Sequence, residues 1–299
     1  MWVANAPCSW GLPDPEVQGE MVGYRQMLDE LVATGYTGTE LGDLGYMPTD
    51  PAALRVEMVS RGLAMLGSFV GVALDDPDAH DEGEERAVRV ARLLAAVAGE
   101  TPPVLVLADA NGTVPMRIEC AGRITPEQMM PEDRWPIYAQ GANRIARAVL
   151  ERTGLRTVFH PHCAGWIETP EEIARLLELT DPALVGLCFD TGHYTYGGGE
   201  ALDGLRRFGD RVAYVHIKDC SAEVAARARS EGWDYSRAVR HGIFCELGRG
   251  TVDFPGVLAG LRRRGYDGWL IVEQDVVFGL GTPKESAARN REYLRGIGV

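Results

Sequence analysis

The sequence of 299 residues lacks several features that would point to whole classes of function. It has no apolar run near the roughly 20 residues that span a bilayer, and its first stretch, "MWVANAPCSW", lacks a basic region followed by an apolar one. No segment is rich in lysine or arginine, and the formal net charge is −13, which argues against a nucleic acid or an anionic membrane as partner. We therefore expect a cytoplasmic protein that acts on a small molecule.

The chain also lacks the spacings that mark two common kinds of site. No glycine-rich phosphate loop follows the first predicted strand, as it usually does in a doubly wound dinucleotide-binding sheet. The cysteines show no short paired spacing, which argues against a zinc knuckle and against a disulfide framework. There is no linker or low-complexity tract, so we expect a single domain over residues 1–299. The cysteines are Cys8, Cys120, Cys163, Cys188, Cys220 and Cys245.

What the chain does contain is a regular alternation of apolar runs with segments of helical character. The runs are nearly continuous in apolar residues, which is typical of strands in a parallel sheet that is covered on both faces. Eight such units predict an α/β protein, a single (β/α)8 TIM barrel. The predicted strands are residues 2–6, 38–42, 63–70, 103–109, 156–162, 184–190, 212–219 and 268–274.

Helix signals fall between the predicted strands. An apolar stripe at residues 27–32 ends near a glycine, as in a helix that packs one face on a sheet. Asp50 and Thr169 each precede a proline, which is typical of an N-cap followed by the first helical position. We therefore expect helices to begin at Pro51 and Pro170.

Two connections are longer than a barrel needs. Residues 110–140 and 220–250 both follow the carboxyl end of a predicted strand. Long connections in compact domains tend to be functional, so we expect both to cover the mouth of the barrel.

Ionisable side chains gather at the carboxyl ends of four adjacent predicted strands, the place where barrels of this type build their active sites. Taken one at a time, they have structural alternatives: Asp190 before Thr-Gly is also typical of a helix cap, and His216 of a hydrogen-bonded core histidine. Burying carboxylates beside several imidazoles without a cation would be very costly, so together they predict a divalent metal. The candidates are His160 and His162, Asp190, His216 with Lys218, and Glu273.

Oxygen and imidazole ligands without thiolates suit Mn²⁺, Co²⁺, Fe²⁺, Mg²⁺ or Zn²⁺, and we favour Mn²⁺. The stretches "FHPH", "ETPEEI", "FDTGHYTYGGG", "RVAYVHIKDC" and "GWLIVEQD" resemble, over nearly the whole chain, the xylose isomerase-like barrel superfamily of sugar isomerases, epimerases and dehydratases. Within it, "NAPCSWG", "GYTGTELG", the His-X-His of the fifth strand and "HGIFCELGRGTVDF" are most similar to the inosose dehydratases, which dehydrate 2-keto-myo-inositol.

This resemblance implies a metal held by Glu, Asp, His and Glu on the fifth to eighth strands. Asp190, His216 and Glu273 match the last three, whereas His160 stands where the first Glu is expected. We expect Glu168 to supply the missing carboxylate, with His160 as the rival ligand. The structural alternative for Glu168 is an acid near a helix N-terminus, which is favourable without any metal.

The resemblance further implies a metal-assisted elimination of water from a polyhydroxylated ketone. His162 is the expected base, and His160 or Lys218 would protonate the departing hydroxyl. The structural alternative for Lys218 is a salt bridge with Asp219 or a supporting contact to a metal ligand. Substrate contacts are expected from Glu40 and Trp10, from Arg249 in a glycine-flanked loop, and from His193 beside the metal; for Trp10 the alternative is rim packing, and for Arg249 a solvated side chain.

Other functions fit parts of the same pattern. On this barrel, a metal-dependent isomerase or epimerase, or a lyase of 3-keto-glycosides, would share the abstraction of a proton beside a carbonyl. An endonuclease for abasic sites belongs to the same superfamily, but the acidic charge argues against it. A non-catalytic sugar-binding barrel is the alternative outside catalysis. The resemblance also implies a homo-oligomer.

Overall fold

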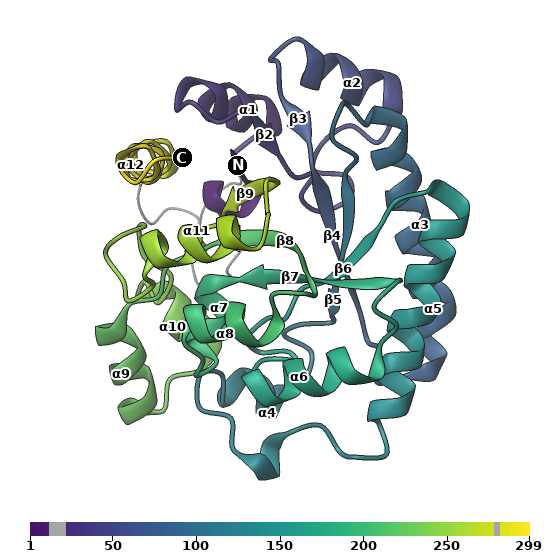
Figure 1. The fold of residues 1–299 in the computed structure, drawn as a ribbon, viewed down its shortest axis with the longest axis vertical. Helices are drawn as coiled ribbons and strands as arrows, with labels where there is room; N and C mark the ends of the chain where they lie inside the picture. Colours follow the sequence, from purple (N-terminus) through teal and green to yellow (C-terminus); the bar gives the residue numbers. More distant parts are fainter. Residues whose placement is uncertain (12–21, 278–281) are drawn as a thin grey trace.

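All strands of the computed structural model, which describes residues 1–11, 22–277 and 282–299, lie in one parallel sheet (Figure 1). The strands are β1 (Trp2–Asn5), β2 (Gly38–Thr39), β3 (Ala64–Met65), β4 (Gly67–Val72), β5 (Val104–Asp109), β6 (Thr157–Phe159), β7 (Val185–Asp190), β8 (Val212–Ile217) and β9 (Trp269–Val272). Their order in the sheet is β3-β2-β1-β9-β8-β7-β6-β5-β4. The two edge strands, β3 and β4, are consecutive in the chain.

Leu66, between β3 and β4, closes the sheet into a barrel. Its backbone N–H donates to the Thr39 carbonyl of β2 at 3.0 Å, and its carbonyl accepts from Val104 N–H of β5 at 2.9 Å. The chain therefore pairs with β2 before Leu66 and with β5 after it. The prediction of one continuous strand over residues 63–70 is wrong, because this segment forms two strands, β3 and β4. Together these strands fill one position of the barrel, and the predicted (β/α)8 barrel is confirmed.

In the described residues a long helix follows each barrel position and covers the outside of the sheet (Figure 1). The predicted starts at Pro51 and Pro170 are confirmed: Asp50 accepts from Ala53 N–H at 2.8 Å, and Thr169 and Glu172 form a reciprocal capping box. The helices are α1 (Tyr24–Ala33), α2 (Pro51–Val59), α3 (His80–Val97), α5 (Trp135–Thr153), α6 (Pro170–Leu179), α8 (Ala201–Phe208), α11 (Phe254–Arg263) and α12 (Pro283–Gly296).

A small layer of buried side chains lies inside the barrel. It is a packed core and not a channel, as expected for eight strand positions. Each strand position around the barrel contributes to it except β2, and these side chains are almost fully buried. The layer contains Ala4, Leu66, Val106, Val158, Cys188, Tyr214 and Ile271.

The two long connections follow the carboxyl ends of β5 and β8. The first carries α4 (Pro115–Glu119) and the 3-10 turn η3 (Pro126–Gln128); the second carries α9 (Ala222–Glu231) and α10 (Tyr235–Arg240). Arg229 Nε donates to the Gly122 carbonyl at 2.9 Å, and Arg123 Nη1 donates to the Trp233 carbonyl at 2.6 Å, so the two connections are tied together. They share a hydrophobic cluster with the loops below, including Cys163, Tyr196, Trp233 and Phe244.

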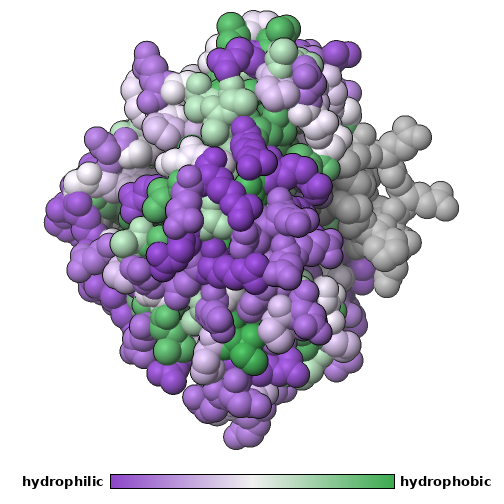
Figure 2. Space-filling model, turned by 90° about the vertical axis from the view of Figure 1, so that its right-hand side faces the viewer, coloured by the Kyte–Doolittle hydropathy of each residue, from purple (hydrophilic) through white to green (hydrophobic). Residues whose placement is uncertain are grey.

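The face drawn in Figure 2 describes one side of the outside of the molecule. Figure 2 shows that the side of the molecule on the right of Figure 1 is mainly hydrophilic, with small and separate hydrophobic patches. Among the described residues, no helix combines the length and the apolar character that crossing a membrane requires. All six cysteines are free thiols.

Candidate metal centre and active site

The twofold alternation of strand side chains brings four ionisable residues to one point. Val158, Cys188, Tyr214 and Ile271 fill the barrel interior, and the residue two positions after each points the same way but lies at the carboxyl end of the strand. Those residues are His160, Asp190, His216 and Glu273. Each offers a ligand atom, and these atoms all lie within 4.8 Å of one another.

The cluster is buried and only partly paired. Asp190 also caps the short helix α7 (Thr191–Tyr196), because its Oδ1 accepts from Gly192 and His193 N–H at 2.8 Å. His160 Nε2 lies 3.5 Å from Asp190 Oδ2, and His216 Nδ1 lies 3.8 Å from the same oxygen and 3.2 Å from Glu273 Oε1. Both ring nitrogens of His160, Asp190 Oδ2 and His216 Nδ1 are buried without a hydrogen-bond partner. Buried polar atoms are rarely left in this state, because each costs free energy. Two imidazoles and two carboxylates that converge in this way fit a divalent metal ion.

The charge state of the two carboxylates agrees with metal binding. Burial alone would raise the pKa of Asp190 and Glu273, but the ammonium of Lys218 and the neighbouring imidazoles outweigh it and hold both pKa values below the ordinary range. Both groups are therefore carboxylates at neutral pH, which is the form that binds metals.

Glu40, predicted to contact substrate, instead holds a histidine of the cluster. It follows β2, is buried, and its Oε1 lies 3.0 Å from His216 Nε2. This contact directs the other ring nitrogen, Nδ1, at Asp190 and Glu273. A carboxylate behind a metal-binding histidine is a common arrangement, since it sets both the tautomer and the ring orientation.

Lys218 lies next to the cluster and pairs with three carboxylates, none of which is Asp219; the longest contact joins its Nζ to Asp190 Oδ2 at 3.9 Å. Its Nζ is 3.0 Å from Glu273 Oε2, 2.9 Å from Asp275 Oδ1 and 3.0 Å from His193 Nε2. Burial would lower the pKa of Lys218, but Asp275 and Glu273 raise it well above the ordinary value. The side chain is therefore an ammonium that joins His193 to the cluster.

His162 lies beside the cluster, and one of its ring nitrogens is engaged in a hydrogen bond. Its Nδ1 lies 2.6 Å from the Cys163 carbonyl, so in the neutral ring Nδ1 carries the hydrogen and donates it. Desolvation, with His160 and Lys218 nearby, lowers the pKa of His162 to about 3. The ring is a neutral imidazole at pH 7 with an electron pair on Nε2.

A cavity at the barrel mouth reaches this imidazole. Its volume is about 420 Å³, within the range of small-molecule sites. Phe69 and His162 both line the cavity, and both rings contact His160, with centroids 6.3 and 5.6 Å away. The cavity therefore lies next to the four-residue cluster. Its lining consists of Asp43, Leu44, Phe69, Val70, Gly71, Arg86, Val90, Asp109, Ala110, Asn111 and His162.

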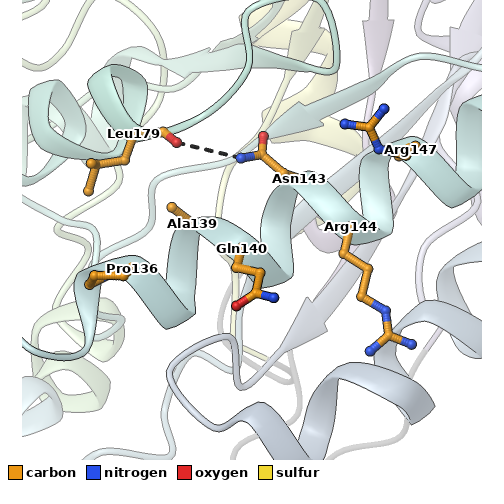
Figure 3. Close-up of a pocket in the computed structure, with 7 residues that line it drawn as sticks. All are labelled: Pro136, Ala139, Gln140, Asn143, Arg144, Arg147 and Leu179. Carbon is orange, nitrogen blue, oxygen red and sulfur yellow. Dashed lines mark hydrogen bonds between the residues drawn. The ribbon is translucent and has the colours of Figure 1, made fainter.

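A second cavity lies on the outside of the barrel. It measures about 450 Å³ and is formed by α5 with the end of α6, where Asn143 Nδ2 donates to the Leu179 carbonyl (Figure 3). No histidine or carboxylate lines it, so it offers none of the acid-base or ligand chemistry found at the mouth. Its lining is Pro136, Ala139, Gln140, Asn143, Arg144, Arg147 and Leu179.

Glu168 is placed outside the metal-type cluster. One of its carboxylate oxygens accepts from Gly122 N–H at 2.6 Å and the other from Ala164 N–H at 3.0 Å. It is buried, and desolvation raises its pKa to about 7. Glu168 therefore joins the first long connection to the loop after β6, and the rival residue, His160, occupies the position at the cluster.

Two other residues expected at the substrate also lie elsewhere. Trp10 is buried, and its indole N–H donates to Glu30 Oε2 of α1 at 2.8 Å, so its polar edge faces the outer helix layer. Arg249 has a side chain that is 68% exposed and pairs with Glu246 at 3.3 Å. These placements are packing for Trp10 and a solvated surface position for Arg249, the structural alternatives named for them. His193, by contrast, is at the site: its ring centroid is 3.8 Å from that of His162.

Asp275 and Asp109 are parts of the site that we did not predict from the sequence. Asp275 stands two residues after Glu273 and binds Lys218, so the same twofold spacing that relates His160 to His162 could have indicated it. Asp109 ends β5 and accepts from Trp166 N–H at 2.7 Å, and burial raises its pKa to about 6. A terminal aspartate on an apolar strand was the signal, as for Asp190.

Comparison with known proteins agrees with this barrel fold. The sequence model of the xylose isomerase-like TIM barrel family matches residues 23–297. The chain belongs to this family. An inosose dehydratase from Geobacillus kaustophilus (strain HTA426) is 32% identical over 98% of this chain and 93% of the relative. One from Geobacillus thermodenitrificans (strain NG80-2) is 31% identical over 97% and 95%.

Solved structures of the family share the fold at low sequence identity. A probable 3-DHS dehydratase from Bacillus anthracis is 12% identical and superimposes with a TM-score of 0.71 over 99% of each chain. A D-allulose 3-epimerase from Methylomonas is 16% identical with a TM-score of 0.70 over 99% of this chain and 98% of the other. With its curated relatives, this family member is an enzyme of the lyase or isomerase kind.

Proposed function

We propose that this enzyme is a dehydratase that removes water from a polyhydroxylated cyclic ketone, 2-keto-myo-inositol, with the help of a divalent cation. The observation that carries the proposal is the pairing of a neutral base, His162, with the adjacent ligand cluster of His160, Asp190, His216 and Glu273. The relationship to inosose dehydratases over nearly the full length supports the choice of substrate.

The four-residue cluster would hold the cation. Its two imidazoles favour Mn²⁺, Fe²⁺, Co²⁺ or Zn²⁺ over Mg²⁺, which prefers oxygen ligands, and we favour Mn²⁺. When bound, the cation would supply a Lewis acid for the ketone oxygen, and so acidify the hydrogen on the neighbouring carbon. Glu40 would keep His216 in its binding orientation.

His162 would carry the proton in both directions. Its Nε2 takes the hydrogen from the carbon beside the ketone, a carbon–carbon double bond forms, and the bond to the β-hydroxyl breaks. The low pKa of His162 makes its protonated form a strong acid, so the same Nε2 then gives the proton to the departing hydroxide, which leaves as water. Lys218 holds Glu273 and balances charge in this scheme, since its own pKa is raised and it retains its proton.

Epimerisation is the second candidate, since epimerases share this fold. In the superfamily pattern two carboxylates act as ligand and base, and here His160 replaces one of them. The two remaining acid-base imidazoles, His162 and His193, lie together with centroids 3.8 Å apart. An epimerase must protonate the opposite face of the carbon, so a base on one side favours elimination.

Product analysis tests the proposal. The protein is incubated with 2-keto-myo-inositol and Mn²⁺ in D₂O, and the ultraviolet absorbance of a conjugated enol-dione is followed alongside proton NMR. We expect the dione to form, and His162→Gln to abolish its formation, while His241→Gln at an exposed position retains it. Recovery of a deuterated or inverted ketone without the dione would support an epimerase instead.

A further inference from the structure

The ammonium of Lys218 sits in a cage of atoms that are themselves metal-ligand types. Its side chain is 1% exposed, and Nζ contacts Asp275 Oδ1, Glu273 Oε2 and His193 Nε2 at 2.9, 3.0 and 3.0 Å. The ring of Phe244 lies on a further side, with its centroid 4.7 Å from Nζ. Asp190 Oδ2 lies farther out, 3.9 Å from Nζ, so three carboxylates and an imidazole surround one buried cation. The same groups would also bind a divalent metal ion.

The residues around Lys218 form a second ligand set beside the first. His162, His193 and Asp275 offer atoms within 4.8 Å of one another, and so do Cys8, Glu273 and Asp275. Neither set is the four-residue cluster of the proposed metal centre. The mouth of the barrel therefore carries two adjacent positions at which ligand atoms converge.

Glu273 is shared between the two positions. Its Oε1 faces His216 Nδ1 at 3.2 Å, and its Oε2 faces Lys218 Nζ at 3.0 Å. In two-metal sites such a carboxylate bridges two cations a few ångströms apart. Here one of the two carboxylate oxygens already faces a cation that is part of the chain.

We propose that the Lys218 ammonium occupies the second cation position of a site built for two, so that this enzyme binds one divalent ion per chain. The inference rests on the proposed function, because it requires that the first ion binds at the four-residue cluster. Lys218 is thereby a positioning residue: it neutralises Glu273 and Asp275, holds His193, and lies 3.9 Å from Asp190 Oδ2 at the edge of the first cluster.

Removal of the ammonium should create a second metal site. Lys218→Ala would leave Glu273, Asp275 and His193 facing a space without a cation, which a divalent ion can relieve. Lys218→Met fills the same volume without charge, and so is the matched control. Lys218→Ala combined with Asp275→Asn removes a ligand of the new site.

The experiment counts metal ions. Metal-free wild type and variants are saturated with Mn²⁺, freed of excess ion, and analysed by elemental mass spectrometry and by electron paramagnetic resonance. We expect one ion per chain in the wild type, two in Lys218→Ala with an exchange-coupled spectrum, and one in both Lys218→Met and the double variant. Mn²⁺ should also raise the melting temperature more in Lys218→Ala than in Lys218→Met.

The count separates this inference from the proposed function. Two ions in the wild type, or a folded Lys218→Ala that binds no more ions than the wild type, would overturn the inference. A Lys218→Ala chain that Mn²⁺ cannot bring to fold would also overturn it, because the metal then fails to replace the ammonium. A wild type that binds no ion contradicts the proposed metal centre, whereas the difference between Lys218→Ala and wild type still decides the role of Lys218.

Discussion

His160 Nε2 lies 3.5 Å from Asp190 Oδ2 at the ends of two adjacent strands, and neither atom makes a hydrogen bond. Both residues are buried, so each unpaired atom costs about 1–3 kcal/mol unless something between them binds both. In the sequence pattern of the superfamily a glutamate stands at the position of His160. Substitution of His160 is therefore the test of whether this residue holds the metal.

Matched glutamine variants should separate His160 from Glu168. His160→Gln should weaken Mn²⁺ binding by more than the roughly 10–100-fold that is typical of losing an outer partner of a metal ligand. Glu168→Gln should leave Mn²⁺ affinity within a few-fold, but lower the free energy of unfolding by about 1–3 kcal/mol, because its amide NH₂ would face a backbone donor. Calorimetric titration and urea unfolding measure the two effects. The reverse pattern would make Glu168 the ligand.

Glu40 should act on metal affinity through His216. Glu40→Gln keeps an acceptor for His216 Nε2 and should weaken Mn²⁺ binding slightly, whereas Glu40→Ala removes the acceptor and should weaken it by about 10–100-fold. The number of ions per chain should stay the same in both variants. Equal affinity in Glu40→Ala and wild type would contradict a role for Glu40 in orienting His216 for metal binding.

The buried pair of Arg117 and Glu172 should hold the first long connection in place. Two bonds of 2.9 and 3.0 Å join the guanidinium on α4 to the carboxylate at the start of α6, and both side chains are fully buried. Arg117→Met should lower the free energy of unfolding by about 3–5 kcal/mol and speed hydrogen exchange in residues 115–128. Arg134→Met, which removes a half-exposed partner of Asp75, is the control and should change little. Equal effects from both variants would contradict this account.

Asp109 should make stability depend on pH. Burial raises its pKa from 3.8 to about 6, so between these values the folded chain keeps a proton that the unfolded chain has lost. The free energy of unfolding therefore falls as pH rises through this window. Asp109→Asn cannot ionise and can still accept from Trp166 N–H, so it should exceed the wild type by about 1–3 kcal/mol near pH 8 and match it near pH 4. Urea unfolding of metal-free protein measures this; a difference that does not change with pH would exclude Asp109 as its source.

Much of the barrel and its mouth could be predicted because side chains alternate along a strand. Once the core-facing positions of a strand are known, the direction of the side chain at its end follows. Asp190, His216 and Glu273 each follow an apolar run, and the parity of the run fixes the direction of the last side chain. The same rule placed His160 at the cluster, but the resemblance to the superfamily led us to prefer Glu168. The structure places the His160 ring at the cluster and the Glu168 carboxylate outside it.

Loop residues could not be predicted in the same way. Trp10 and Arg249 stand outside the strands, so no alternation fixes where their side chains point, and packing against α1 and pairing with Glu246 decide it. The division of the third strand depends on Leu66, which hydrogen-bonds to neighbours on two sides and so reflects closure of the whole sheet. The residues that make such contacts lie far apart in the chain, so no local sequence pattern indicates them.

The central claim is that elimination of water depends on one cation held by His160, Asp190, His216 and Glu273. The most direct measurement is the initial rate of enol-dione formation from 2-keto-myo-inositol by metal-free protein titrated with Mn²⁺. The account predicts no product without metal and a rate that rises linearly and saturates at one equivalent per chain. The same rate with and without added metal, in protein shown to be metal-free, would contradict it.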